Sequence, residues 1–120
     1  MDRLKFEKLV ARAIEQLPAE FREKLENVAV IVEDRPSAEL LEQMEVLPGD
    51  TLFGLYEGTP LTERGFQTPL HPDRIWIFQK PIEAARETEE EIIEEIEITI
   101  VHEVAHFFGL DDDYLDDLGY

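Results

Sequence analysis

The longest uninterrupted helical pattern in the sequence lies near its C-terminal end. The stretch from Glu87 to Phe108 contains neither glycine nor proline. Apolar residues recur in it at spacings of three and four, with acidic residues on the opposite side, as on a helix with one buried face. The apolar residues are Ile92, Ile93, Ile96, Ile100, Val104 and Phe107 or Phe108. The β-branched segment IEITIV alone would also suit a strand, but the unbroken length predicts one helix from about Ala84 to Phe108, ended by Gly109.

A second amphipathic pattern opens the chain. Its apolar residues also recur at helical spacing, which predicts a helix from about Asp2 to Leu17 with one buried face. These residues are Phe6, Leu9, Val10, Ala13, Ile14 and Leu17. Pro18 should end or bend this helix. The segment PAEFREKLEN that follows could add a short helical turn.

Three segments have the composition of strands. The run VAVIV, Val28–Val32, has the length and β-branched content of a largely buried strand. TLFGLYEG, residues 51–58, is a plausible second strand. RIWIFQ, from Arg74 to about Gln79, alternates well enough for a third, and Pro81 should place its end at an edge or just beyond strand pairing.

The remaining segments connect these strands. SAELLEQMEV, residues 37–46, reads as a short helix capped by Ser37. Its inward residues would be Leu40, Leu41 and Met44. Pro48, Gly49 and Asp50 should form a turn. GTPLTERGFQTPLHPD, residues 58–73, is rich in turn-forming residues and predicts an ordered loop.

Length and composition limit the domain count and the location. The 120 residues, 43% of them hydrophobic, suffice for one core, so we expect a single domain spanning residues 1–120. Arg3, Lys5, Lys8 and Arg12 interrupt the first segment, which therefore suits neither a signal peptide nor a membrane span. Because cysteine is absent, the cytosol is the expected location, and any metal must be held by nitrogen and oxygen atoms.

The charge excludes some partners. The chain has 29 acidic and 11 basic residues, and its formal net charge of -18 repels phosphate backbones and anionic lipid surfaces. We therefore expect neither a nucleic acid nor a membrane as a partner. The composition leaves the oligomeric state open.

The end of the long helical pattern carries a motif for metal chemistry. In VHEVAHFFGLDDDY, His102 and His106 lie one helical turn apart, roughly 5 to 6 Å between their β-carbons, so both imidazoles can reach one ion. Glu103 lies beside them and is too displaced to ligate easily, as in HExxH proteins, where the glutamate takes a proton from metal-activated water. Glu95 and Thr99 continue the histidine face, which predicts a polar stripe. The alternative is a helix end whose histidines are solvated or cap its last carbonyls.

A third ligand follows from the residues after the motif. Gly109 allows the chain to turn back, so that Asp112 can present a carboxylate to the same ion and leave one position for water. No glutamate follows His106 that could act as the distant third ligand of thermolysin-type peptidases. The later methionine turn of metzincins is also missing, because the only methionines are Met1 and Met44.

Other polar residues near the motif have simpler interpretations. Asp111 and Asp113 flank the expected ligand and read as solvated acids, because the spacing prefers Asp112. Tyr114 could stabilise an oxyanion, but aromatic packing is the commoner role. His71 lies in the expected loop, and we exclude it from the site. Two further acids, Asp116 and Asp117, are expected on the surface.

With its HExxHxxGxxD motif, the chain resembles the minimal zincin-like bacterial proteins of the metallopeptidase class. The resemblance extends to VAVIVEDRP, LFGLYEGTPLTERG and PDRIWIFQKPI, and so covers most of the chain. It implies a compact α+β fold, with a small mixed sheet packed against the N-terminal helix and the HExxH-bearing helix. By motif position it implies that His102, His106 and Asp112 bind one Zn²⁺ and that Glu103 is the general base.

These observations lead to one main functional hypothesis and two rivals. The main hypothesis is a zinc-dependent metallopeptidase that hydrolyses a peptide or protein substrate through metal-activated water. The substrate would pair with an exposed sheet edge, for which RIWIF and LFGLY are candidates. The first rival is a non-catalytic zincin-like module that binds metal or a protein partner. The second, a metal-dependent ribonuclease, is disfavoured by Glu103 and by the charge of -18.

Overall fold

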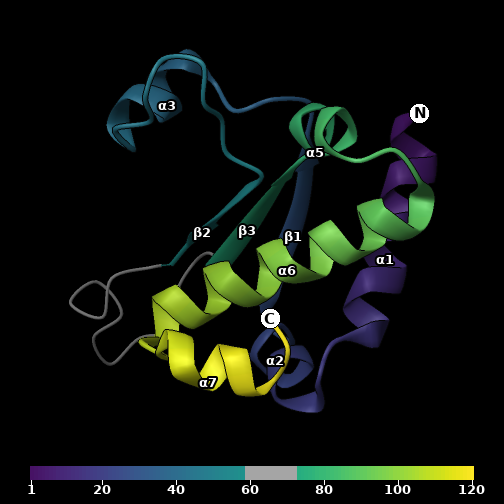
Figure 1. Ribbon diagram of the computed structural model, residues 1–120, viewed down its shortest axis with the longest axis vertical. Helices are drawn as coiled ribbons and strands as arrows, with labels where there is room; N and C mark the ends of the chain where they lie inside the picture. Colours follow the sequence, from purple (N-terminus) through teal and green to yellow (C-terminus); the bar gives the residue numbers. More distant parts are fainter. Residues whose placement is uncertain (59–72) are drawn as a thin grey trace.

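The computed structural model describes residues 1–58 and 73–120, and the predicted loop lies almost entirely outside them, together with His71. Figure 1 shows a small sheet with helices layered on one side of it. The elements in chain order are α1 (Arg3–Gln16), α2 (Ala19–Lys24), β1 (Val28–Glu33), α3 (Ala38–Gln43), β2 (Gly54–Glu57), β3 (Asp73–Phe78), α5 (Gln79–Ala85), α6 (Glu89–Phe108) and α7 (Asp112–Asp117). The expected α+β class is confirmed.

The sheet has three strands in the order β1-β3-β2. The central strand β3 is parallel to β1 and antiparallel to β2, and its residue Ile75 lies opposite both Val30 and Tyr56. RIWIF is therefore not an edge strand, whereas the expectation that Pro81 follows the end of strand pairing is confirmed. Pro81 lies just beyond pairing, in the first turn of α5, where the missing N–H would have no helical partner in any case.

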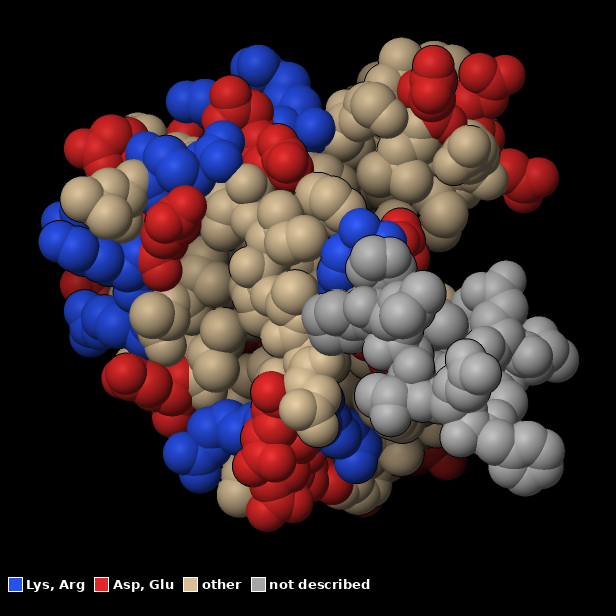
Figure 2. Space-filling model, turned by 180° about the vertical axis from the view of Figure 1, so that it is seen from behind, with Lys and Arg blue, Asp and Glu red and all other residues tan. Residues whose placement is uncertain are grey.

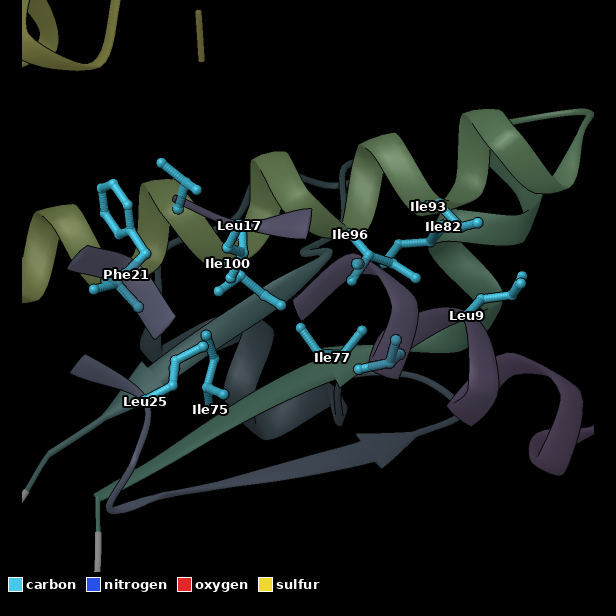
Figure 3. Close-up of a cluster of buried hydrophobic side chains, with 14 of the residues drawn as sticks. Leu9, Leu17, Phe21, Leu25, Ile75, Ile77, Ile82, Ile93, Ile96 and Ile100 are labelled. Carbon is cyan, nitrogen blue, oxygen red and sulfur yellow. The ribbon is translucent and has the colours of Figure 1, made fainter. Parts of the chain in front are cut away.

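The core lies between the sheet and the helices on its one covered face. Figure 3 shows side chains from α1, α2, α5 and α6 meeting those of β3. Ile75 and Ile77 are fully buried there, as are Ile96 and Ile100 of α6. The predicted inward face of α1 is also confirmed, and Asp2 caps this helix by accepting a hydrogen bond from the Lys5 backbone. The core thus fixes α6 across the sheet.

The long C-terminal helix is shorter than its sequence pattern predicts. The chain forms two helices here, because α5 ends at Ala85 and the backbone of Arg86 is extended. The second helix, α6, begins after Thr88, whose side chain and backbone exchange hydrogen bonds with Glu91 in a capping box. The end of α6 matches the prediction, because Gly109 takes the left-handed conformation, with φ 75°.

The segments around α3 are less buried than their sequences predict. Strand β1 is half-buried rather than largely buried, since it forms one edge of the sheet. Ser37 caps α3 as predicted, yet no residue of α3 is buried and Met44, just after it, is 46% exposed. Leu40 and Leu41, which were predicted to face inward, are half-buried, and the prediction is wrong for Met44. Figure 1 shows the reason, because α3 lies apart from the other helices.

The face of the molecule behind α6 carries charge mainly around its rim. Figure 2 shows basic and acidic side chains intermixed around this face and uncharged residues in its middle. No helix within residues 1–58 and 73–120 is long and apolar enough to cross a membrane.

The close packing of α6 on β2 gives a first prediction. A β-carbon on Gly54 would lie 2.7 Å from the Thr99 methyl group and 2.7 Å from the Trp76 carbonyl oxygen. Gly54→Ala should therefore lower the free energy of unfolding by about 1–3 kcal/mol, measured by urea denaturation. Thr51→Ala, at an exposed position just before β2, should change it by less than about 0.5 kcal/mol. Equal losses in both variants would contradict the close approach.

Candidate functional site

The two histidines of the motif lie together on the last turns of α6. Their ring centroids are 6.1 Å apart and the ring planes are inclined by 69°. His102 is half-buried, whereas His106 is exposed. The predicted shared face is thus present, because residues four apart on a helix lie one above the other.

The face that continues the histidines is covered rather than solvated. Glu95 is 5% exposed and Thr99 is 8% exposed. Glu95 forms an ion pair of 2.7 Å with Arg86, in the link between α5 and α6. Thr99 lies against Gly54 of β2. The predicted polar stripe is therefore largely buried by tertiary contacts.

Glu103 is held by the edge strand β2. Its Oε1 accepts a hydrogen bond of 3.1 Å from the Tyr56 backbone N–H. Phe53, three residue pairs before Tyr56, bonds to Phe78 across the sheet, and in an antiparallel pair bonded and non-bonded positions alternate. The N–H of Tyr56 accordingly points away from β3. On that side it donates its hydrogen bond to the carboxylate of Glu103. This backbone contact has no signal in the sequence.

The surroundings of Glu103 favour its protonated form. Burial raises the pKa of the Glu103 carboxyl above its usual range, and the Tyr56 N–H bond and the charges of His106 and His102 offset this only in part. A carboxyl group whose pKa is raised in this way accepts and releases protons more readily near neutral pH.

Contacts on either side fix Glu103 along the strand. One helical turn before it, Thr99 meets Gly54, and one turn after it, Phe107 meets Gly58 so closely that a β-carbon there would lie 2.3 Å from the ring. Phe107 also stacks on the Tyr56 ring, with centroids 4.2 Å apart. The carboxylate therefore sits in the middle of a continuous contact between α6 and β2.

The residues after Gly109 form a short helix that the sequence did not predict. Asp111 is its cap and accepts a 2.8 Å bond from the Tyr114 N–H, so it is more than a solvated acid. Asp112 is the first residue of α7 and is exposed. In the described part of the chain, no three His, Asp or Glu side chains gather closely enough to hold an ion. The two histidines thus lie together without Asp112 in the same cluster.

The chain after α7 brings Tyr120 close to His102. The Tyr120 carbonyl oxygen lies 3.2 Å from Nε2 of His102. The hydroxyl of Tyr114 instead donates a hydrogen bond to Glu20, in α2. The remaining acids of this segment, Asp113, Asp116 and Asp117, are exposed as predicted.

The histidine pair suits a divalent transition metal. Zn²⁺ accepts imidazole nitrogens, and two rings one helical turn apart can supply two of its ligands. In the absence of cysteine, further ligands must be oxygen or nitrogen atoms. His102 and His106 therefore fit such an ion.

The bond between Glu103 and Tyr56 gives a second prediction. Glu103→Gln keeps a carbonyl oxygen as acceptor, whereas Glu103→Ala leaves the Tyr56 N–H without it, at a cost of about 1–3 kcal/mol. The alanine variant should therefore unfold at a lower urea concentration than the glutamine variant. Identical midpoints would show that this bond contributes nothing to stability.

Comparisons with known proteins identify the family and support the fold. A family model described as zincin-like metallopeptidase matches residues 25–120. Among solved structures, a conserved hypothetical protein from Thermus thermophilus matches with a TM-score of 0.60 and 22% identity, over 90% of this chain and 94% of that one. At this identity the likeness shows the fold alone. A search of curated proteins found no match. The family match spans most of the chain, which therefore belongs to the zincin-like metallopeptidases.

Proposed function

We propose that this protein is a zinc-dependent metallopeptidase that hydrolyses peptide bonds. The observation that carries the proposal is the position of Glu103, half-buried beside two histidines on one helix and bonded to the backbone of an edge strand. Membership of the zincin-like metallopeptidase family supports the same reaction class.

The side chains would divide the work as follows. His102 and His106 would hold one Zn²⁺, with Asp112 as the third ligand because Gly109 turns the chain back after the helix. The bound ion would polarise the substrate carbonyl and ease the deprotonation of water. Glu103 would accept the proton from the attacking water and pass it to the leaving amine.

The substrate would be an extended peptide at the outer edge of β2. Of the two strands expected at an edge, β3 is central, whereas β2 lies at an edge of the sheet and packs against α6. A peptide pairing with β2 would offer a carbonyl to the Tyr56 N–H, which Glu103 now occupies. Substrate pairing would then release Glu103 for proton transfer.

A non-catalytic metal-binding or protein-interaction module is the second candidate. It is favoured by one observation, namely that Asp112 does not join the histidines in a cluster within the described residues. Such a module would bind Zn²⁺ stoichiometrically and cleave no member of a peptide library.

Metal binding can be tested with matched substitutions. His102→Ala, His106→Ala and Asp112→Ala should each weaken Zn²⁺ binding at least tenfold in isothermal titration calorimetry, because each removes a proposed ligand. Asp113→Ala removes the same side-chain type as Asp112→Ala at the next, exposed position of α7 and should leave the affinity unchanged. Full affinity in Asp112→Ala would remove this residue from the ligand set.

Catalysis can be tested at Glu103. Glu103→Gln cannot accept the proton, so peptide cleavage should fall at least a hundredfold while Zn²⁺ is still bound. The measurement is turnover of a fluorogenic peptide library by metal-loaded protein. Equal cleavage by the native protein and the variant would exclude Glu103 as the base.

A further inference from the structure

The sheet face opposite α6 bears a groove beside α3. Figure 2 shows the hollow between the lobe that holds α3, at the upper right, and the rest of this face. Its volume is about 390 Å³, within the range of ordinary ligand sites. We propose that the groove binds a basic peptide segment, with a lysine or arginine side chain against Trp76 and the carboxylates of Glu33 and Glu39. This surface is separate from the histidines, which lie on α6 across the sheet.

Alternation along the strands gives the groove an apolar floor. Ile75 and Ile77 of β3 are buried in the core, so Trp76 between them points to the opposite face. Leu55 of β2 is paired with Trp76 across the sheet, and Leu40 of α3 also lines the groove. Trp76, Leu55 and Leu40 are each half-buried. The floor therefore keeps apolar surface that a partner can cover.

Acidic side chains dominate the rim of the groove. Among the described residues that line it, Glu33, Glu39 and Glu57 are acidic, and Arg35 is the one base. Glu57 is paired with Arg74 over 2.6 Å. Neither Glu33 nor Glu39 forms an ion pair with any residue of the described chain. The rim thus adds to the net charge of -18, which attracts cations and repels anions.

The combination of floor and rim selects the occupant. An ammonium or guanidinium group is attracted to the face of an indole ring, and the methylene stem of lysine or arginine packs on apolar surface. The groove exceeds the volume of one such side chain, so a neighbouring apolar residue of the same peptide can cover Leu40 and Leu55. A second copy of this chain suits the groove poorly, because two chains of charge -18 repel each other.

The first test uses Trp76 as a reporter, because it is the only tryptophan of the chain. The probes are short synthetic peptides that alternate lysine with leucine, lysine with serine, or glutamate with leucine, in the presence of a chelator. Calorimetry measures affinity, and tryptophan emission locates the bound peptide. We expect the lysine–leucine peptide to shift the Trp76 emission and to bind at least about tenfold more tightly than the other two. Unchanged emission, or equal binding of the glutamate–leucine peptide, would overturn the proposal.

The second test removes charge from the rim. Glu33→Gln combined with Glu39→Gln should weaken binding of the lysine–leucine peptide about 2- to 30-fold, because two ion pairs are lost. Glu23→Gln combined with Glu26→Gln changes the net charge equally at exposed positions outside the groove, and the affinity should stay within about twofold. Equal weakening in both double variants would show attraction by net charge alone and overturn the groove as the site.

The third test removes the indole ring. Trp76→Leu keeps an apolar floor, yet it should weaken binding of the lysine–leucine peptide about 2- to 30-fold, because the leucine side chain cannot attract a cation. Full affinity in this variant would overturn the contact with Trp76.

Two further outcomes separate this proposal from its alternatives. A native dimer in light scattering that the lysine–leucine peptide dissociates would show that a second copy occupies the groove, which would overturn the proposal. Since every measurement is made with a chelator present, peptide binding here survives a failure of the protein to bind Zn²⁺ or to cleave peptides. Absence of peptide binding would in turn overturn the groove and leave the proposed function intact.

Discussion

The packing of α6 along the edge strand β2 is the interaction on which the candidate site depends. Thr99, Glu103 and Phe107 of the helix meet Gly54, Tyr56 and Gly58 of the strand and its end. Four residues of helix rise about 6 Å, and two residues of strand rise about 6.7 Å. The two repeats therefore match closely enough for three successive contacts when helix and strand run alongside each other. The two glycines permit the close approach, and Tyr56 between them supplies the backbone N–H that fixes Glu103.

Glu103 combines a structural role with its proposed chemical role. Taking a carboxylate partly out of water is costly unless it receives hydrogen bonds. The half-buried Glu103 receives one from the backbone group that an added peptide strand would need. The same bond that stabilises the side chain in the free protein would therefore be exchanged when a substrate pairs with β2. Residues that take part in a reaction commonly keep surroundings that lower the stability of the folded protein.

The segment after Gly109 folds back beside the histidines of α6. Because Gly109 takes a positive φ, the backbone leaves α6 sharply and forms α7, whose buried Leu115 holds it against the core. The short helix uses Asp111 as its cap and brings the Tyr120 carbonyl to His102, while Asp112 remains exposed at its first turn. This segment thus supplies the proposed third ligand and places a backbone oxygen beside His102.

The sequence by itself determined the features that depend on local geometry. Helical spacing placed α1, most of α6 and the histidine pair, and Gly109 marked the end of α6, because these patterns follow from backbone conformation over a few residues. The break before α6 also had a local signal, because Thr88 and Glu91 form a capping box. The apolar pattern continues across this break, and for that reason it predicted a single helix. Tertiary structure alone decided that β3 is central, that α3 stays exposed, and that Tyr56 and Tyr120 reach Glu103 and His102. Those contacts join residues 47 and 18 positions apart through backbone atoms, which every residue type shares and no sequence pattern can reveal.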